Sequence, residues 1–315
     1  MITSVTLLVL SLFALYIGAG WLVKGSAEIA LKANVSNLVI GLTIVAFGTS
    51  APELVVSINA SLTGQGDIAI GNIVGSNIFN IAVILGISAI IHPLQAKRQL
   101  TRIDIPLLVL STVLLTVLFW NGTLNRLEGC LFLAGIIAYT TFSLYYSRKH
   151  EKKVEENKGE LEKQPEPWYK DVLYIAGGLA ILVFASHLLV DNAVSIAQEL
   201  GVSEAVIGLT LVAAGTSLPE LATSVVAALK KNQDIAIGNI VGSNLFNILA
   251  IAGTSSLINP IVAKNVNYID LLVMLGLTLL LLPIVKTGQK ISRAEGWVLL
   301  VIYLCYLAWL LRDLI

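Results

Sequence analysis

The sequence Ile40-Gly-Leu-Thr-Ile-Val-Ala-Phe-Gly-Thr-Ser-Ala-Pro-Glu53 recurs 167 residues later as Ile207-Gly-Leu-Thr-Leu-Val-Ala-Ala-Gly-Thr-Ser-Leu-Pro-Glu220, with 11 of 14 positions identical. The same spacing carries the stretch from Asp67 to Asn80 onto the stretch from Asp234 to Asn247, with 13 of 14 identities. A repeat at constant spacing indicates a duplicated half-protein. Each copy places one carboxylate inside an apolar segment.

The composition indicates a polytopic membrane protein. Hydrophobic residues make up 56% of the chain and charged residues 13%, with a mean hydropathy of +0.85, whereas a soluble domain has about 25% charged residues. A membrane-spanning helix needs about 20 apolar residues. Ten apolar runs meet this need, five in each repeat, near residues 4–23, 37–62, 68–91, 104–120, 127–147, 171–199, 204–229, 235–258, 268–285 and 294–311.

The distribution of basic residues predicts the orientation in the membrane. With the N-terminus outside, 17 of the 20 Lys and Arg residues fall in inner loops and 3 in outer ones, as the positive-inside rule requires. The first run lacks a basic segment before it and is interpreted as a span and not a signal peptide. We therefore expect a multi-pass protein of the cell membrane with both termini extracellular.

Five spans per repeat make the two halves inverted relative to each other, an architecture of many secondary transporters. We expect an all-α polytopic membrane protein of ten transmembrane helices, in two inverted five-helix repeats with helices 2 and 7 broken at the core. The repeats are predicted at residues 1–147 and 171–315. The polar, Lys- and Glu-rich residues 148–170 between them are predicted to form a cytoplasmic linker.

Glu53 and Glu220 are the first candidate functional residues. A charged carboxylate in hydrocarbon costs several kcal/mol unless a cation or a water-filled cavity compensates it. Pro52 and Pro219 precede the two glutamates, and a proline inside a helix removes one amide donor and disrupts the bond to the carbonyl four residues back. Unwound backbone at membrane depth is tolerated where it lines a cavity, and its carbonyls can coordinate cations.

Other polar residues surround each glutamate in sequence. Hydroxyls three and four residues before each glutamate are expected to share its helical face. The next helix of each repeat carries a Ser and an Asn at positions i and i+4 on one face. Asn72 and Asn239 are interpreted as mostly structural, because small-residue helix contacts often include such hydrogen bonds. The candidate ligands besides the two glutamates are Thr49, Ser50, Ser76 and Asn80 in the first repeat, and Thr216, Ser217, Ser243 and Asn247 in the second.

These residue types favour a hard cation. Ca²⁺ takes about 6–8 oxygen ligands in flexible geometry, whereas transition metals favour imidazole or thiolate, and the motifs contain neither His nor Cys. Two carboxylates also balance one divalent ion. The residues leave three classes of function open: coupled antiport, a passive cation channel, since oxygen-lined sites also occur in selectivity filters, and a membrane-embedded enzyme. The last is disfavoured because no base adjoins the Ser and Asn clusters.

With these motifs aligned, the chain resembles the calcium:cation antiporter superfamily, and within it a prokaryotic or archaeal sodium/calcium exchanger. The paired segments Gly48-Thr-Ser-Ala-Pro-Glu53 and Gly215-Thr-Ser-Leu-Pro-Glu220 resemble the alpha-repeat signatures of Na⁺/Ca²⁺ exchangers. Proton/calcium exchangers usually carry Gly-Asn-x-x-Glu there, so H⁺/Ca²⁺ antiport is the less favoured alternative. Some members have an acid at one of the positions of Asn80 and Asn247, whereas both are Asn here.

The resemblance implies which atoms bind which ion. Ca²⁺ would be held by Glu53 and Glu220 with the backbone carbonyls of Thr49 and Thr216. It further implies Na⁺/Ca²⁺ exchange by alternating access, with the first and sixth helices moving across a core of helices 2, 3, 7 and 8. The transported ions and the lipid bilayer are the expected partners, without prosthetic group, nucleic acid or obligate protein partner. The Na⁺ sites would share the glutamates and add Ser50, Ser217, Ser76 and Ser243.

Overall fold

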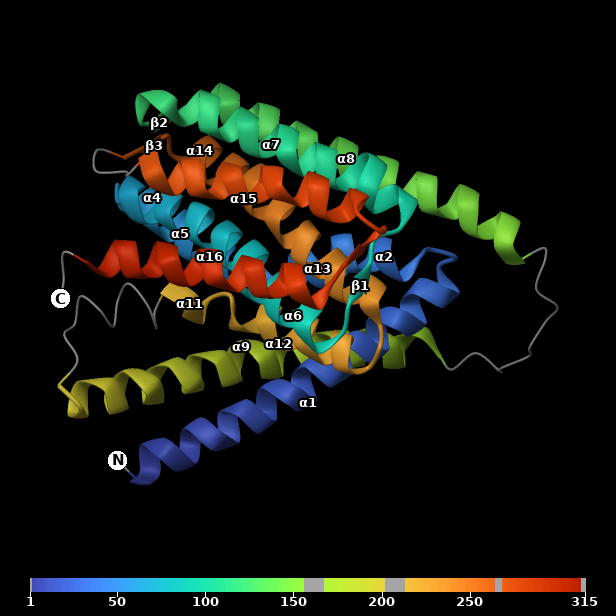
Figure 1. Ribbon diagram of the computed structural model, residues 1–315, viewed down its shortest axis with the longest axis horizontal. Coiled ribbons are helices and arrows are strands. Elements are labelled where there is room, and N and C mark those ends of the chain that lie inside the picture. Colours follow the sequence, from blue (N-terminus) through green and yellow to red (C-terminus); the bar gives the residue numbers. More distant parts are fainter. Residues whose placement is uncertain (1, 156–166, 202–212, 264–267, 313–315) are drawn as a thin grey trace.

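The computed structural model describes residues 2–155, 167–201, 213–263 and 268–312, and these form a bundle of helices (Figure 1). Within this part of the chain, eight helices are long and apolar enough to cross a membrane, or nine if one bent pair counts as a single span. The predicted all-α polytopic membrane architecture is therefore confirmed. The eight spans are formed by α1 (Ile2–Lys32), α5 (Gly66–Phe79) with α6 (Leu85–Ile91), η3 (Leu100–Asp104) with α7 (Ile105–Leu118) and η4 (Phe119–Asn121), α8 (Arg126–Glu155), α9 (Trp168–Glu199), α13 (Gln233–Leu245) with α14 (Ala252–Ile258), α15 (Tyr268–Lys286) and α16 (Arg293–Leu311).

The bent pair is the predicted second span. It begins as α2 (Asn37–Ile40), a π-helical turn η1 (Gly41–Val45) and α3 (Ala46–Thr49), then turns by 49° into α4 (Ala51–Leu62). Pro52 lies in the first turn of α4, where its missing N–H is tolerated. The predicted break is therefore present. In the second copy α11 (Ala213–Gly215) ends at the same place and α12 (Leu218–Leu229) follows, while residues 202–212 lie outside the described residues.

Several spans are longer than the apolar runs that predicted them. The first span was expected over residues 4–23, yet α1 continues to Lys32. Lys24, expected near its end, therefore lies within the helix and donates a hydrogen bond of 3.3 Å to the Tyr174 hydroxyl. Likewise α8 continues to Glu155, into the predicted linker. A hydropathy window misses such extensions because charged residues on the last turns can reach the membrane interface while the backbone stays helical.

Two short antiparallel ladders join the halves at opposite ends of the bundle. At one end β1 (Leu94–Gln95) pairs with β4 (Lys290–Ile291), and at the other β2 (Thr123–Leu124) pairs with β3 (Ile261–Val262). Leu94 faces Ile291 in the first ladder, and Leu124 faces Ile261 in the second. Adding 167 to Leu94 gives Ile261, and adding 167 to Leu124 gives Ile291. The shift makes β1 equivalent to β3 and β2 equivalent to β4. The two ladders are therefore equivalent contacts, each pairing the first strand of one half with the second strand of the other.

The predicted inner loops gather at one end of the molecule. Lys97 pairs with Asp234 at 2.5 Å next to the β1–β4 ladder, and the Arg293 guanidinium donates to the Ile91 carbonyl at 3.5 Å. Lys32 forms an ion pair with Asp171, which connects the ends of α1 and α9. Loops distant in sequence therefore share one face, as the assignment of basic residues requires.

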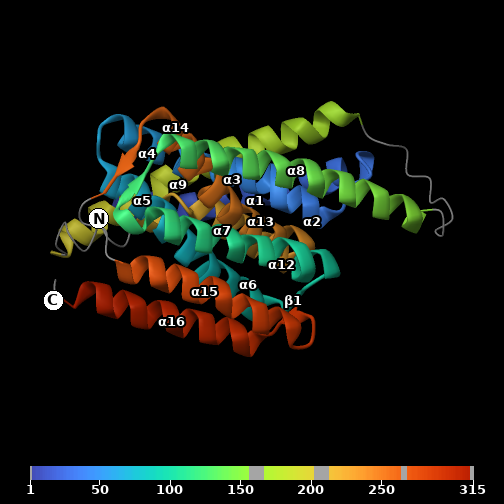
Figure 2. The same cartoon turned by 90° about the horizontal axis from the view of Figure 1, so that it is seen from above.

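The third span of each repeat forms the centre of the bundle. In the most apolar 18 residues of each span, every residue of the α13–α14 span and 78% of those of the α5–α6 span are buried, against 11% in the α16 span. Figure 2 shows α13 in the interior, with α8 and α16 on opposite sides. Each central span contains a π-helical turn, η2 (Asn80–Ile84) or η6 (Phe246–Ile251). Such π turns inside α-helices are frequent at functional sites.

Helices α1 and α9 form a separate pair along one face of the bundle (Figure 1). They approach closely because glycines face each other: a Cβ on Gly178 would lie 2.7 Å from the Gly18 carbonyl oxygen. Trp21 packs edge-on against Tyr174 at 5.9 Å between ring centroids. The two helices are thus fastened to each other by contacts that do not involve the central spans.

Candidate functional site

Glu53 and Glu220 begin the second segments of the two broken helices, and both are buried with 1% of their surface exposed. Their hydrogen bonds cross between the halves. The Ser217 hydroxyl donates to Glu53 Oε1 at 2.9 Å, and the Ser50 hydroxyl donates to Glu220 Oε1 at 2.7 Å. The two carboxylates therefore converge on one site in the middle of the molecule.

This crossing differs from the expectation that Ser50 shares a helical face with Glu53. The reason is the break: Ser50 lies between α3 and α4 with ψ near 9°, outside regular helical geometry. The 49° turn at this residue redirects its hydroxyl away from its own helix and toward the other repeat. The break also leaves each glutamate in the first turn of a new helix, where the helix dipole favours a negative charge.

Many oxygens around the two glutamates have no hydrogen-bond partner although they are buried. Buried polar atoms in proteins are nearly always paired, and an unpaired one costs about 1–3 kcal/mol. A cluster of such oxygens around two carboxylates is the chemistry of a cation site. The unpaired oxygens are Oε2 of Glu53 and Glu220, Oγ of Ser76 and Ser243, Oγ1 of Thr216, and the side-chain amide oxygens of Asn77, Asn80, Asn244 and Asn247. The side-chain amide nitrogens of Asn80 and Asn247 are unpaired as well.

Helix packing brings the two repeats together around these atoms. α4, which carries Glu53, packs against η6, which carries Asn247. In the same way α12, which carries Glu220, packs against η2, which carries Asn80. Thr216 is half-buried at the break between α11 and α12. No cluster of three or more His, Cys, Asp or Glu occurs among the described residues, so the other ligands available here are neutral oxygens.

Asn72 and Asn239 brace the two glutamate segments, as their structural interpretation predicted. The Asn72 amide donates to the Glu53 carbonyl at 3.1 Å and to the Ser57 hydroxyl at 2.8 Å. The Asn239 amide makes the same bonds to the Glu220 carbonyl at 3.4 Å and the Ser224 hydroxyl at 2.9 Å.

Three hydrogen-bond partners of these asparagines, Thr49, Ser57 and Ser224, could be identified only from the fold and not from the motif. Asn239 Oδ1 also accepts a 3.1 Å bond from the Thr49 hydroxyl, which joins the two repeats. The roles of Ser57 and Ser224 were missed in the sequence. Their only signal is their position one helical turn after each glutamate.

Asn239→Ala is expected to destabilise the protein by about 2–3 kcal/mol, because it leaves the buried Ser224 hydroxyl unpaired and the Thr49 hydroxyl with only its 3.4 Å bond to the Ala46 carbonyl. Thermal unfolding of the purified protein in detergent measures the change. Asn192→Ala is the matched control, since the Asn192 amide bonds only its own helix at the Leu188 carbonyl. Equal melting temperatures for the two variants would contradict the bracing role.

A cavity of about 510 Å³ adjoins the broken segments. It lies between α9, which contributes Val183, Ser186 and His187, and the start of α4 and α12 at Pro52 and Pro219. The cavity therefore gives a route along α9 to the two glutamate segments. His187 was interpreted as structural or interfacial, and its exposed side chain lines this route.

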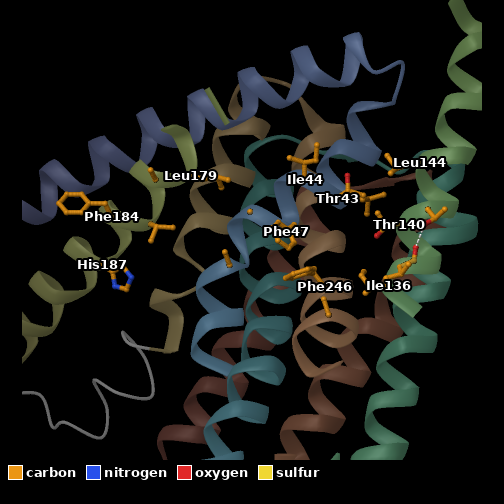
Figure 3. A pocket seen from close by; sticks show the side chains of 18 residues that line it. Thr43, Ile44, Phe47, Ile136, Thr140, Leu144, Leu179, Phe184, His187 and Phe246 are labelled. Carbon is orange, nitrogen blue, oxygen red and sulfur yellow. Dashed lines mark hydrogen bonds between the residues drawn. The ribbon is translucent and has the colours of Figure 1, made fainter. Parts of the chain in front are cut away.

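A larger cavity of about 1100 Å³ adjoins the first along α9, and Ala51, Val183 and His187 line both (Figure 3). Leu179, Phe184 and His187 of α9 border it on one side, and Phe47 and Phe246 face them from the bundle. Its lining contains no carboxylate. Its polar lining is limited to Thr43, Thr140, Thr141 and His187, and neither Glu53 nor Glu220 lines it.

The comparison with known proteins bears on both the repeat and the site. The family model described as "Sodium/calcium exchanger protein" matches residues 3–145 and again residues 170–312, two matches offset by the same 167 residues. The chain is 35% identical over 338 residues to the sodium/calcium exchanger MaX1 of Methanosarcina acetivorans, covering 96% of each chain. It is 35% identical over 264 residues to the inner membrane protein YrbG of Escherichia coli, covering 82% of this chain and 81% of that protein.

Solved structures agree with these relatives. The structure is similar to that of the sodium-calcium exchanger NCX_Mj soaked with 2.5 mM Na⁺ and 0.1 mM Ca²⁺, with a TM-score of 0.84 at 33% identity over 98% of both chains. A second form of NCX_Mj, soaked with 10 mM Na⁺ and without Ca²⁺, matches with a TM-score of 0.83. Two family matches that span most of the chain, and whole-length relatives above 30% identity, establish the relationship. The chain therefore belongs to the sodium/calcium exchanger protein family, a family of membrane transporters.

Proposed function

We propose that this protein exchanges Na⁺ for Ca²⁺ across the cell membrane by alternating access, with the two ions competing for one site at Glu53 and Glu220. The observation that carries the proposal is the set of buried oxygens without partners around two carboxylates whose hydrogen bonds cross between the repeats. Such a set is costly unless a cation compensates it. Membership in the exchanger family supports the choice of ions.

Both ions are substrates and would use overlapping ligands. Ca²⁺ would be bound by the two glutamate carboxylates and the backbone carbonyls of Thr49 and Thr216, consistent with its preference for about 6–8 oxygens. The amide oxygens of Asn80 and Asn247 are further candidates, because both are buried without partners. The Na⁺ sites would share the glutamates and add the hydroxyls of Ser50, Ser217, Ser76 and Ser243.

Competition follows from charge. Two carboxylates balance one Ca²⁺ or two Na⁺, and the described part of the site offers no further acidic side chain. Loading both kinds of ion together would leave excess positive charge in a low-dielectric interior, which is strongly unfavourable. The site therefore releases one kind of ion as the other binds, as an exchanger requires.

The proposed architecture is ten transmembrane helices in two inverted repeats, residues 1–147 and 171–315, with residues 148–170 as a cytoplasmic linker. The exchanged ladders and the crossed serine–glutamate bonds support a two-fold relationship between the halves. An odd number of spans in each half inverts the second half. The even total of ten places both termini on the same side, and the distribution of basic residues makes that side the outside. The predicted inner loops share one end of the bundle, which supports the same orientation.

Radiolabelled Ca²⁺ uptake into proteoliposomes tests the exchange. Vesicles loaded with Na⁺ are expected to accumulate Ca²⁺, whereas vesicles without Na⁺ are not, because the outward Na⁺ gradient supplies the driving force. A pH gradient without Na⁺ separates the alternatives: uptake driven by it would favour H⁺/Ca²⁺ antiport. Uptake that requires neither gradient would indicate a passive channel and contradict the proposal.

A further inference from the structure

The repeat relates the surfaces that line the cavity beside the glutamates to a second pair of surfaces in the molecule. The side chains that α9 and α4 give to the cavity include Ser186, His187 and Val56. A shift of 167 residues carries them onto Ala19 and Gly20 of α1 and Thr223 of α12. The interface between α1 and α12 is therefore the counterpart, in the other half, of the open route between α9 and α4.

This counterpart interface is closed. Ala19 and Thr223 are fully buried, and Val23 is 3% exposed. Helix α1 packs directly against α12 along it. The same pair of surfaces thus encloses a cavity in one half and is packed shut in the other, so the molecule is asymmetric about its internal two-fold axis.

One side chain crosses the closed interface. Lys230 caps the C-terminus of α12, and its ammonium group donates a 3.3 Å hydrogen bond to the backbone carbonyl of Gly20. A Cβ atom on Gly20 would lie 3.0 Å from Lys230 Nζ, so glycine leaves room for the ammonium group to reach the helix backbone. In the other half the counterpart of Gly20 is His187, which borders the open cavity.

The open half lacks an equivalent cross-link. The counterpart of Lys230 is Thr63, at the C-terminus of α4. Its hydroxyl bonds the carbonyls of Asn59 and Ala60 on its own helix, at 2.9 and 3.2 Å. A threonine is too short to span the interface that the four-carbon lysine chain crosses.

The closed interface also holds a polar atom that its counterpart lacks. Thr223 Oγ1 is buried without a hydrogen-bond partner, whereas Val56, its counterpart, lines the open cavity with methyl groups. An unpaired buried hydroxyl is unfavourable in a packed interface, and hydration removes that cost when the interface opens. Thr223 therefore favours a state in which water, and the ions it carries, reaches this surface.

We propose that Lys230, through its bond to the Gly20 carbonyl, holds closed the α1–α12 interface at which the proposed alternating access would open the inner passage. This inference rests on the proposed exchange function and names the residue that controls access from the linker side. Breaking the bond releases α1, and with it the fastened α9, to move toward the state in which the inner passage is hydrated. The bond is exposed to solvent, which weakens it, so we expect it to bias the two states severalfold and not to abolish one of them.

Cysteine labelling tests this directly. In a background in which Cys130 and Cys305 are replaced by Ala, Thr223→Cys reports on the inner passage and Val56→Cys on the open cavity. A membrane-impermeant cationic methanethiosulfonate is added from either side of oriented proteoliposomes. With Lys230 present, we expect labelling at 56 from the outside and slow labelling at 223. Lys230→Met should raise the rate at 223 from the linker side about fivefold and lower the rate at 56.

Lys231→Met is the control, because it removes the same charge one position away at a residue with φ of 59° beyond the helix end. It is expected to leave both rates unchanged. Ala222→Cys, on the preceding residue, replaces Thr223→Cys as reporter if the latter variant does not fold. Equal rates at 223 with and without Lys230 would overturn the inference. Labelling does not depend on exchange, so a failure of Na⁺-driven uptake would reject the proposed function without affecting this result.

Discussion

Replacing Glu53 by Gln is expected to lower Na⁺-driven Ca²⁺ uptake by about 100-fold or more. Glutamine keeps the shape of the side chain and can accept the Ser217 hydrogen bond, but it removes one of the two negative charges that face the ion. In a buried site the loss of one charge opposite a divalent cation is worth several kcal/mol, and each ~1.4 kcal/mol is a factor of ten. Initial rates in proteoliposomes with equal amounts of reconstituted protein measure the change.

Glu220→Gln should behave in the same way, because the two glutamates are equally buried and exchange equivalent bonds with the opposite repeat. The matched control is Glu28→Gln, which makes the same chemical change on an exposed side chain of α1. It is expected to leave the rate within about a factor of two, as surface changes usually do. A Glu53→Gln protein that kept a tenth or more of the parent rate would exclude Glu53 as a primary ligand.

The location of the candidate site could be proposed from sequence, because the free-energy cost of burying its carboxylates can be recognised there. A carboxylate after a proline, twice at the same spacing in apolar segments, requires compensation in any fold. The repeat also predicted the broken helix, since proline acts locally. The ladders between β1 and β4 and between β2 and β3 were beyond reach, because two-residue strands have no periodic pattern and form only once the halves are docked.

The hydrogen bonds within the candidate site were harder to predict than the residues that could enter it. Spacing placed Ser50 on the face of Glu53, which holds for a continuous helix, but the bend directs its hydroxyl to Glu220. The same limit applies to the Thr49–Asn239 bond, whose two residues are 190 positions apart. Local rules give the residues that enter a site, while contacts across the repeat axis depend on how the two halves dock.

The candidate site has a neutral asparagine at the same position in each repeat. Asn80 and Asn247 occupy equivalent positions in η2 and η6, and the amide groups of both are buried without partners. Both are neutral, so the negative charge of the described site comes from the two glutamates alone. An amide does not gain or lose a proton in the physiological range. The ion balance of the site therefore depends on which cations are bound and not on protonation at these two positions.

Gly242→Ala is expected to destabilise the protein by overpacking the crossing of α13 and η1. Its added Cβ would lie 2.7 Å from both the Cα and the carbonyl oxygen of Leu42, and 2.8 Å from the Ala46 Cβ. These are backbone and near-backbone atoms, so no side-chain rotation can relieve the contact and α13 must move away from η1. Overpacking of this kind costs about 1–3 kcal/mol, which lowers the melting temperature by about 2–5 °C in a protein of this size.

The matched control for this glycine is Gly135→Ala on α8, whose Cβ would meet only the Leu249 methyl groups at 3.5 and 3.9 Å. Alanine is favoured over glycine within a helix by about 1 kcal/mol, so this variant should be neutral or slightly more stable. Opposite signs of the stability change in the two variants would distinguish the effect of packing from that of helix propensity. Displacement of α13 would also shift Ser243 and Asn244, so transport should fall in Gly242→Ala alone. Unchanged melting and transport would show that the α13–η1 crossing does not hold these ligands in place.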